Sequence, residues 1–321
     1  MKEFADCTDT VLMLRPDHFG FNESTEATNV FQTRVEHLTN EEIHERGLAE
    51  FEQFRSLLSG AGVNVLVFDD TGDPHTPDAI FPNNWFSTHQ EGTLVLYPME
   101  GENRRHERRN DIVRWLQLNY GFHRILDLTH YELQERFLEG TGSMVLDRVH
   151  GTVYACVSTR TDATVINEFA AALSLQRVTT FAADVKTNEE TGFSAFHPIY
   201  HTNVMMALGS SIAVICAETI RDEKERGRVM SSLWNTGHEV IEISTAQLNR
   251  FAGNMLQLKT RHGERLWVMS TKAAQSLTPH QHNRLTSNGS TILHSSLDTI
   301  ELVGGGSARC MLAEIFHPSL R

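Results

Sequence analysis

Residues 139–162 read EGTGSMVLDRVHGTVYACVSTRTD, which is a strand-like run, a Gly-containing turn and a second strand-like run. This pattern predicts a β-hairpin. Segments of the same form begin at Asp78, His201 and Asn254, and each copy starts with a polar residue at the head of its first strand. A further step of similar length reaches Cys310. The chain is therefore expected to consist of repeated units, and Cys310 is expected to open the fifth.

The segments between the hairpins repeat as well. A helical pattern follows the first hairpin over residues 104–120, and Gly121 is expected to end this helix. A short apolar run, typical of a strand, comes next. The fifth unit lacks these parts at the C-terminus, but residues 10–15, 40–59 and 63–70 supply a strand, an amphipathic helix and another strand. We therefore expect an α/β fold, a five-bladed pseudo-symmetric α/β propeller closed by the N- and C-terminal strands, in a single domain spanning residues 1–321. A doubly wound α/β sheet is the alternative, although hairpins argue against it.

Composition restricts the classes of partner. The 321 residues are 40% hydrophobic and 21% charged, as in soluble globular proteins, and the formal net charge is -13. This charge argues against nucleic acid and anionic membranes as partners, and no apolar run is long enough to span a bilayer. The four cysteines are far apart and no signal-like segment follows Met1, which predicts a reduced, cytoplasmic protein without disulfides or a structural zinc site. A homo-oligomer is compatible with the sequence.

The unit order, together with Asp78, Glu139, His201 and Cys310, resembles the guanidino-group-modifying superfamily of arginine deiminases, dimethylarginine hydrolases and amidinotransferases, which are five-fold α/β propellers. The strings FGFNESTEATNVFQ, FPNNWFSTH, YHTNVMM and GGGSARCM resemble the branch of citrulline-utilisation hydrolases. The resemblance implies that Cys310 attacks the substrate carbon, His201 transfers protons and Glu139 supports the site. It also implies a small amino-acid substrate.

Elementary chemistry requires the same residue types. Attack on a planar carbon bearing two nitrogens needs a thiolate, and a neighbouring imidazole can deprotonate Cys310 or lower its pKa. One imidazole at His201 can protonate the leaving amine and later deprotonate water. A carboxylate at Glu139 can accept hydrogen bonds from substrate N–H groups and favour a charged imidazole. This chemistry needs no metal and no organic cofactor. Taken singly, Cys310 could instead be a small buried apolar residue and His201 a strand cap.

Two departures from the family patterns indicate the substrate. Residues 78–84 read DAIFPNN where dimethylarginine hydrolases carry D-x-x-F-x-E-D, and Asn203 follows His201 where arginine deiminases carry H-x-D. Acids have thus been replaced by amides, which suit a neutral ureido carbonyl better than a cationic guanidinium. These changes favour citrulline over arginine as the substrate.

An amino-acid substrate also presents a carboxylate, which the planar guanidinium of an arginine can bind. Arg160 lies in Ser158-Thr159-Arg160-Thr161, which resembles the family's S-x-R-T element, and Arg104 or Arg105 is the second candidate. Asn254 has no assigned role, and residues 16–39 are a candidate loop over the cleft. The predicted substrate-binding residues are Asp78, Phe81, Asn84, Arg104, Arg105, Arg160 and Asn203.

Other functions remain open on sequence alone. An arginine deiminase or methylarginine hydrolase would use the same Cys310, His201 and Glu139. An amidinotransferase would keep these residues and use an amine in place of water. A non-catalytic binding propeller would keep the repeats but would not need the three reactive residues together.

Overall fold

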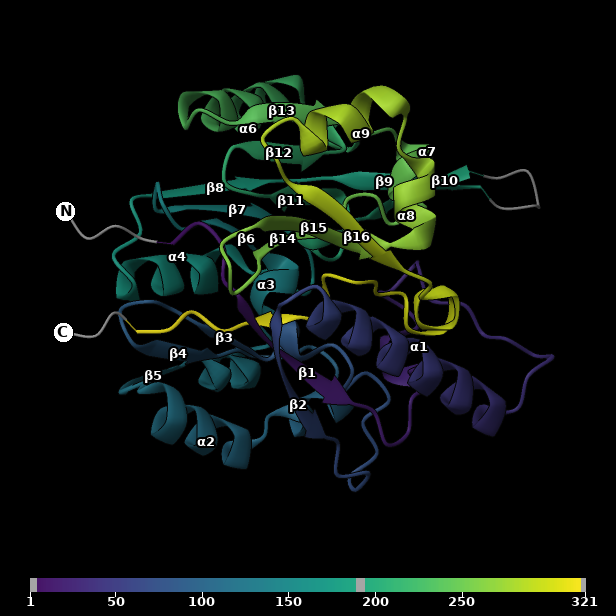
Figure 1. The fold of residues 1–321 in the computed structure, drawn as a ribbon. Helices are drawn as coiled ribbons and strands as arrows, with labels where there is room; N and C mark the ends of the chain where they lie inside the picture. The colour runs from purple at the N-terminus through teal and green to yellow at the C-terminus, as the bar shows by residue number, and fades with distance from the viewer. Residues whose placement is uncertain (1–4, 189–193, 319–321) are drawn as a thin grey trace.

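The computed structural model of the chain describes residues 5–188 and 194–318, and its architecture is α/β (Figure 1). The described strands form five three-stranded sheets and one two-stranded sheet. In four of the three-stranded sheets an antiparallel hairpin is joined by a parallel strand that follows a helix. These four sheets are β3 (Phe86–Thr88), β4 (Thr93–Leu96) and β5 (Arg124–Asp127); β6 (Val145–Asp147), β7 (Thr152–Cys156) and β8 (Arg177–Phe181); β11 (Met206–Leu208), β12 (Ile212–Ile215) and β13 (Glu239–Glu242); and β14 (Leu256–Lys259), β15 (Arg265–Ser270) and β16 (Thr291–Ser295).

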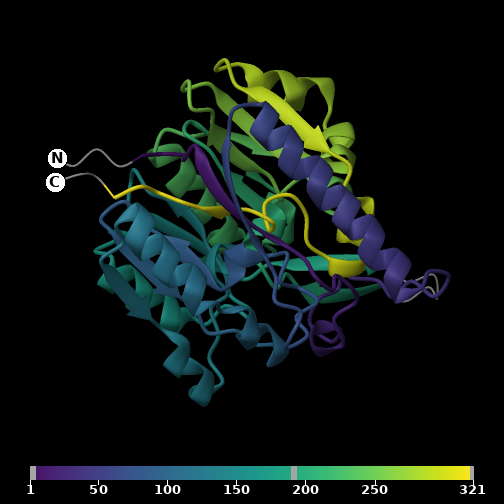
Figure 2. The ribbon, with the colours of Figure 1, turned by 60° about the horizontal axis from the view of Figure 1, so that its bottom comes forward.

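The fifth sheet is assembled from both ends of the chain. Strand β1 (Thr10–Arg15) pairs antiparallel with β17 (Ala313–Glu314) and parallel with β2 (Asn64–Asp69). Figure 2 shows the purple β1 beside the yellow C-terminal segment. The predicted pairing of the terminal strands is thus present. Each sheet in the described part of the chain is open, with two edge strands.

The main helices begin and end where the sequence supplies caps. Thr39 and Glu42 form a capping box at the start of α1 (Asn40–Gly60), Asp162 caps α4 (Ala163–Ala172), and Gly121 ends α2 (Asn110–Tyr120) with a φ of 77°. Helix α1 packs its apolar face against β2 and β16. The remaining helices are α3 (Gly140–Ser143), α5 (Thr202–Met205), α6 (Glu223–Asn235), α7 (Thr245–Leu248), α8 (Thr271–Ser276) and α9 (Pro279–Thr286). No helix of the described residues is long and apolar enough to cross a membrane.

One expected helix is divided. The pattern expected as one helix over 104–120 consists of the 3-10 segment η3 (Asn103–Glu107) followed by α2. The segment after β15 forms two helices, α8 and α9, because Thr278 caps a new helix with Pro279 in its first turn. The other 3-10 segments are η1 (Glu23–Thr25), η2 (Pro82–Asn84), η4 (Thr129–Gln134) and η5 (Ala217–Thr219).

Two elements were not predicted. A hairpin of β9 (Asp184–Asn188) and β10 (Ser194–Pro198) follows the second repeat unit. The segment Ile300–Gly304 (η6) is a π-helix. The predicted single domain, residues 1–321, includes residues 1–4, 189–193 and 319–321, which lie outside the described residues.

The polar residues that open the repeats do not stand directly on the strands. Glu139 is the N-cap of α3 and His201 is the N-cap of α5, so one helical turn separates each from its strand. Gly140 permits this turn because its φ is 49° and a β-carbon there would lie 2.3 Å from the carbonyl oxygen of Asn83. These one-turn helices direct the polar side chains to a common place between the sheets.

Candidate active site

A narrow pocket collects side chains from most of the repeats. Cys310 and His201 both line it, and Glu139 lies directly behind His201. Five of the predicted substrate-binding residues line the same pocket, together with residues from the N-terminal segment and the glycine run. The lining residues are Asn29, Asp78, Phe81, Asn84, Arg104, Arg160, Tyr200, His201, Gly304, Gly306 and Cys310. Of the other two predicted substrate-binding residues, Asn203 contacts Cys310 from outside this lining and Arg105 lies elsewhere.

His201 and Glu139 form a buried hydrogen-bonded pair. The Nε2 atom of His201 lies 2.8 Å from Oε2 of Glu139. Burial raises the pKa of Glu139, but Arg160, His201 and Arg104 outweigh burial and hold that pKa well below its usual range. Burial lowers the pKa of His201, and Glu139 opposes this shift. The pair therefore contains a fixed carboxylate that favours the imidazolium form of His201.

The Cys310 thiol is held between two amides. Its Sγ atom accepts hydrogen bonds from Nδ2 of Asn254 at 3.2 Å and Nδ2 of Asn203 at 3.4 Å. Asn254 is itself oriented, since its Oδ1 accepts from the backbone N–H of Arg309 at 3.0 Å and its Nδ2 also donates to the carbonyl of Asn203. Donors directed at sulfur stabilise a thiolate. Asn254, which has no role assigned from the sequence, therefore contacts the candidate nucleophile. Its position at the head of the fourth repeat is the sequence feature that points to a place in the site.

The other three cysteines lie in different environments. Cys7, Cys156 and Cys216 are buried and do not line the pocket, and the thiols of Cys7 and Cys216 lie against the carboxylates of Asp6 and Glu218. Burial raises the pKa of each of these thiols to about 12. They are therefore protonated near neutral pH and are unsuitable as nucleophiles.

Arg104 is buried in the lining of the site, where it binds Glu107 and Asn84. Its Nε and Nη2 atoms form a bidentate pair with Glu107 at 2.7 and 2.9 Å, and its Nη1 donates to Oδ1 of Asn84 at 3.1 Å. Asp78 and Glu139 each have an oxygen 3.6 Å from the guanidinium. A bidentate carboxylate partner fixes the plane of the guanidinium, so Arg104 in turn fixes the orientation of the Asn84 amide.

Arg160 is buried on the other side of Glu139. Its Nε donates to Glu100 at 2.9 Å and its Nη2 donates to Oγ1 of Thr28 at 2.6 Å, while its Nη1 lies 3.6 Å from Glu139. The guanidinium also lies over the Tyr200 ring at 4.7 Å. These contacts give Arg160 one defined orientation at the pocket.

Two atoms of the pocket residues have unused hydrogen-bonding capacity. Among the described residues, Oδ1 of Asp78 and Nδ2 of Asn84 are buried without a hydrogen-bond partner. The other Asp78 oxygen accepts from Nδ2 of Asn22 at 2.7 Å. Buried polar atoms without partners are costly, so these two mark where a ligand would supply a donor and an acceptor.

One of the predicted substrate-binding residues lies away from the pocket. Arg105 does not line the pocket: its Nε donates to the carbonyl of Met99 at 3.1 Å and its side chain is partly exposed. Because consecutive residues of the 3-10 segment η3 point in different directions, only Arg104 of the pair faces the site. Gly304 and Gly306 also line the pocket, and β-carbons at these positions would lie 2.9 and 2.8 Å from the ring of Phe81. These glycines therefore make room for Phe81.

The N-terminal segment contributes residues that sequence reasoning missed. Asn29 lines the pocket and its Nδ2 donates to the carbonyl of Gly304 at 3.1 Å. Thr28 and Asn22 contact Arg160 and Asp78 as described above. Residues 16–39 lack periodicity, and only their Asn and Thr content indicated a role near the cleft. Within 5–188 and 194–318, no three His, Cys, Asp or Glu side chains are grouped so that they could hold a metal ion.

The family described as N,N dimethylarginine dimethylhydrolase, eukaryotic, matches residues 15–317 of the sequence. The chain belongs to this family. As a member of the dimethylarginine dimethylhydrolase family it lies within the guanidino-group-modifying superfamily, so the resemblance in its motifs is confirmed. A search of curated proteins gave no match.

Solved structures share the fold of this dimethylarginine dimethylhydrolase family member. The N-terminal domain of ArgZ, covalently bound to a reaction intermediate, matches with a TM-score of 0.71 and 16% identity over 97% of this chain and 99% of that domain. Apo ArgZ, an arginine dihydrolase from the ornithine-ammonia cycle in cyanobacteria, has 17% identity, and the match covers 97% of this chain and 41% of ArgZ. A dimethylarginine dimethylaminohydrolase adduct with S-methyl-L-thiocitrulline matches with a TM-score of 0.59 and 12% identity over 96% of this chain and all of that one.

Gly142 offers a test of the site geometry. A β-carbon at Gly142 would lie 2.3 Å from Nδ2 of Asn84 and 2.8 Å from Nδ1 of His201. We expect Gly142→Ala to lower kcat/KM by ~100-fold, because displacing catalytic groups by about 1 Å has effects of that order. Gly227→Ala is the matched control, since nothing lies within 4 Å of its β-carbon position. Equal kcat/KM for the two variants would contradict this arrangement.

Proposed function

We propose that the protein hydrolyses the terminal C–N bond of a ureido or guanidino amino acid, and that its substrate is L-citrulline. The observation that carries this proposal is the Cys310 thiol, which receives two amide hydrogen bonds in the pocket that His201 also lines, with Glu139 hydrogen-bonded to His201. We further infer that the five three-stranded sheets are the blades of one pseudo-fivefold propeller, with the pocket at their junction.

The proposed reaction proceeds through a covalent thiol adduct. The Cys310 thiolate attacks the ureido carbon, and the terminal nitrogen leaves as ammonia after His201 protonates it. Water, deprotonated by His201, then attacks the resulting thiocarbamate and releases the thiolate. The product, N-carboxyornithine, loses carbon dioxide to give ornithine. Asn203 and Asn254 stabilise the negative charge on sulfur both before attack and after release.

The unpaired pocket atoms support citrulline. Nδ2 of Asn84 is a donor suited to the ureido carbonyl, and Oδ1 of Asp78 is an acceptor suited to a ureido N–H. Arg160 is the candidate for the substrate carboxylate. A guanidinium substrate would offer only N–H groups, so the Asn84 donor would remain without a partner.

Arginine is the second candidate substrate. The unpaired Asp78 oxygen is a carboxylate and could bind a cationic guanidinium. The similar ArgZ structures are those of an arginine dihydrolase, one of them bound to its product. In that case hydrolysis of one C–N bond would give citrulline and ammonia, and hydrolysis of a second would continue to ornithine.

The proposal is tested by incubating the protein separately with L-citrulline, L-arginine and methylated L-arginines, and by measuring ornithine, citrulline and ammonia. Ornithine and ammonia from citrulline are expected. Turnover of arginine to citrulline, with no reaction of citrulline, would refute citrulline as the substrate in favour of a deiminase. Amine-dependent product formation would indicate an amidinotransferase.

The Asn84 amide provides a test of substrate choice. In Asn84→Asp a carboxylate oxygen would replace the Nδ2 donor, which would repel a ureido carbonyl and attract a guanidinium. We expect the ratio of kcat/KM for arginine to that for citrulline to rise by ~10-fold or more. Asn84→Ala is the control, because it removes the donor without adding charge and should weaken citrulline turnover alone. An unchanged ratio in Asn84→Asp would argue against contact between Asn84 and the substrate.

A further inference from the structure

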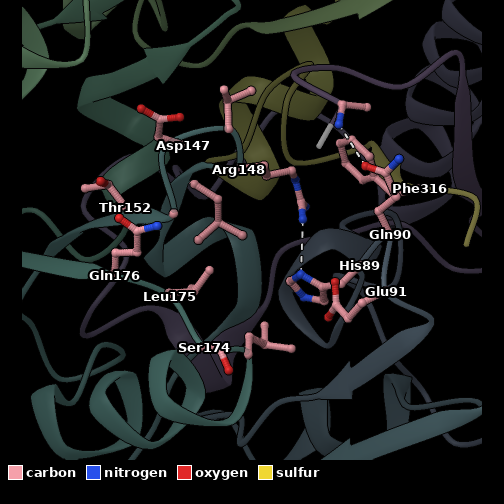
Figure 3. Close-up of a pocket in the computed structure, with 15 residues that line it drawn as sticks. His89, Gln90, Glu91, Asp147, Arg148, Thr152, Ser174, Leu175, Gln176 and Phe316 are labelled. Carbon is pink, nitrogen blue, oxygen red and sulfur yellow. Dashed lines mark hydrogen bonds between the residues drawn. The ribbon is translucent and has the colours of Figure 1, made fainter. Parts of the chain in front are cut away.

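A second cavity lies between the sheet of β3–β5 and the sheet of β6–β8 (Figure 3). Its volume is about 290 Å³, close to the lower end of the range of ~300–1,000 Å³ typical of small-molecule sites. It is formed by the turns of the two hairpins, by the end of α4 and by Phe316. No residue lines both this cavity and the catalytic pocket. The two are linked along the chain by α3 and β6, since Glu139 precedes α3 and Arg148 follows β6.

Arg148 brings a positive charge into the lining of this cavity. Its Nη1 lies 3.1 Å from Nδ1 of His89 and 3.4 Å from the carbonyl of Thr88, and its guanidinium lies 4.0 Å from the centre of the Phe316 ring. Within the described chain, no carboxylate lies at ion-pair distance from Arg148, and its buried Nη2 has no hydrogen-bond partner. Burial lowers the pKa of His89 well below its ordinary value, so His89 is neutral and adds no charge. The carboxylates of Glu314 and Glu91 act on the Arg148 guanidinium only from beyond ion-pair distance, so this buried guanidinium lacks a direct anionic partner in the described part of the chain, which is costly.

Glu91 brings a negative charge into the same lining. It lies in the turn between β3 and β4, close in sequence to His89, and Figure 3 shows it on the side of the cavity where the Arg148 side chain reaches His89. Its buried Oε1 has no hydrogen-bond partner among the residues that the structure describes. The other acid in the lining, Asp147, is occupied by Nδ1 of His150 at 2.9 Å. Glu91 therefore offers an acceptor for a cation.

One part of the wall is apolar. Leu146 and Val149 come from the second hairpin, and Leu173 and Leu175 come from the segment that follows α4. The remaining polar side chains of the wall are those of Gln90, Thr152, Ser174 and Gln176. The apolar part favours an aliphatic group, which gains free energy when its surface leaves water.

We propose that this cavity is a second binding site, for an α-amino acid with an aliphatic side chain. The ligand carboxylate pairs with Arg148, its ammonium group pairs with Glu91, and its side chain lies against Leu173 and Leu175. A zwitterion satisfies both unpaired charges at once, whereas a simple carboxylate or a simple amine would leave one of them unpaired. This site does not depend on the chemistry proposed for Cys310.

The test is calorimetric titration of the full chain with L-leucine. We expect binding with a Kd of roughly 10 µM to 1 mM. Arg148→Gln and Glu91→Gln should each weaken binding by ~10-fold or more, and Arg177→Gln, an exposed control outside the lining, should not. The analogue 4-methylpentanoate lacks the ammonium group, and 3-methylbutylamine lacks the carboxylate. Each should bind at least ~10-fold more weakly than leucine.

Several results would overturn the proposal. These are the absence of leucine binding, unchanged binding in Arg148→Gln, or binding of 4-methylpentanoate as tight as that of leucine. Unfolding curves establish whether the charge variants are folded. If they are not folded, leucine binding is measured with Leu175→Trp instead. This substitution fills the cavity from the apolar side, away from the charged groups, and is expected to abolish binding. Retention of leucine binding by folded Leu175→Trp would also contradict the site.

Discussion

Cys310→Ala is expected to reduce kcat by at least ~10⁴-fold while leaving the unfolding transition close to that of the unaltered protein. Removal of a catalytic nucleophile has effects of this order, because no other group can form the covalent intermediate. The alanine retains the β-carbon, and Cys310 lies beside a pocket, so little packing is lost. Steady-state rates with L-citrulline and L-arginine, together with thermal unfolding curves, provide the measurement.

Cys216→Ala is the matched control for this variant. Cys216 is buried beside β12, its pKa is raised to about 12 by burial, and it does not line the pocket. We expect it to lose at most ~1 kcal/mol of stability and to keep its kcat. If Cys310→Ala retained near-normal turnover, or if Cys216→Ala lost it, the assignment of the nucleophile would be wrong.

Glu139→Gln is expected to lower kcat/KM by ~10²–10⁴-fold at pH 7, which is the range associated with general acid–base catalysis. Glu139 raises the pKa of His201 against the effect of burial. Without the carboxylate, the His201 pKa falls further and a smaller fraction of imidazolium is present at any pH. Since His201 protonates the leaving nitrogen, the alkaline limb of the pH profile should move to lower pH.

This shift separates an electrostatic role of Glu139 from a structural one. Profiles of kcat/KM recorded between pH 5 and 9 would show the displaced limb if Glu139 acts on the His201 pKa. A uniform loss of activity, with the limb at an unchanged pH, would mean that Glu139 only holds the shape of the site. Glu132→Gln is a suitable control, because Glu132 pairs with Arg108 outside the pocket.

The repeated units could be predicted from the sequence because their apolar residues follow the periods of strands and helices. A polar residue at the start of each unit marked where the unit begins. That series also brought Glu139, His201 and Cys310 to attention before any geometry was known. The β9–β10 hairpin and the π-helix at Ile300–Gly304 interrupt the repeat, so a pattern based on repetition could not find them.

The finer details of the site depend on the directions in which individual side chains point, which the sequence does not specify. Arg104 and Arg105 are adjacent and chemically alike, and only the turn of η3 sends one to the pocket and the other to the surface. Asn254 gained its role from a hydrogen bond to sulfur across 56 positions of sequence. Residues such as Asn29 act from irregular backbone, where no periodicity identifies the inward face.

The most direct test of the central claim is mass spectrometry of the protein quenched with acid during turnover of L-citrulline. The account predicts an adduct equal in mass to citrulline less ammonia, carried by the peptide that contains Cys310 and absent from Cys310→Ala. Conversion of citrulline to ornithine without any adduct on Cys310, or with the adduct on another cysteine, would contradict it.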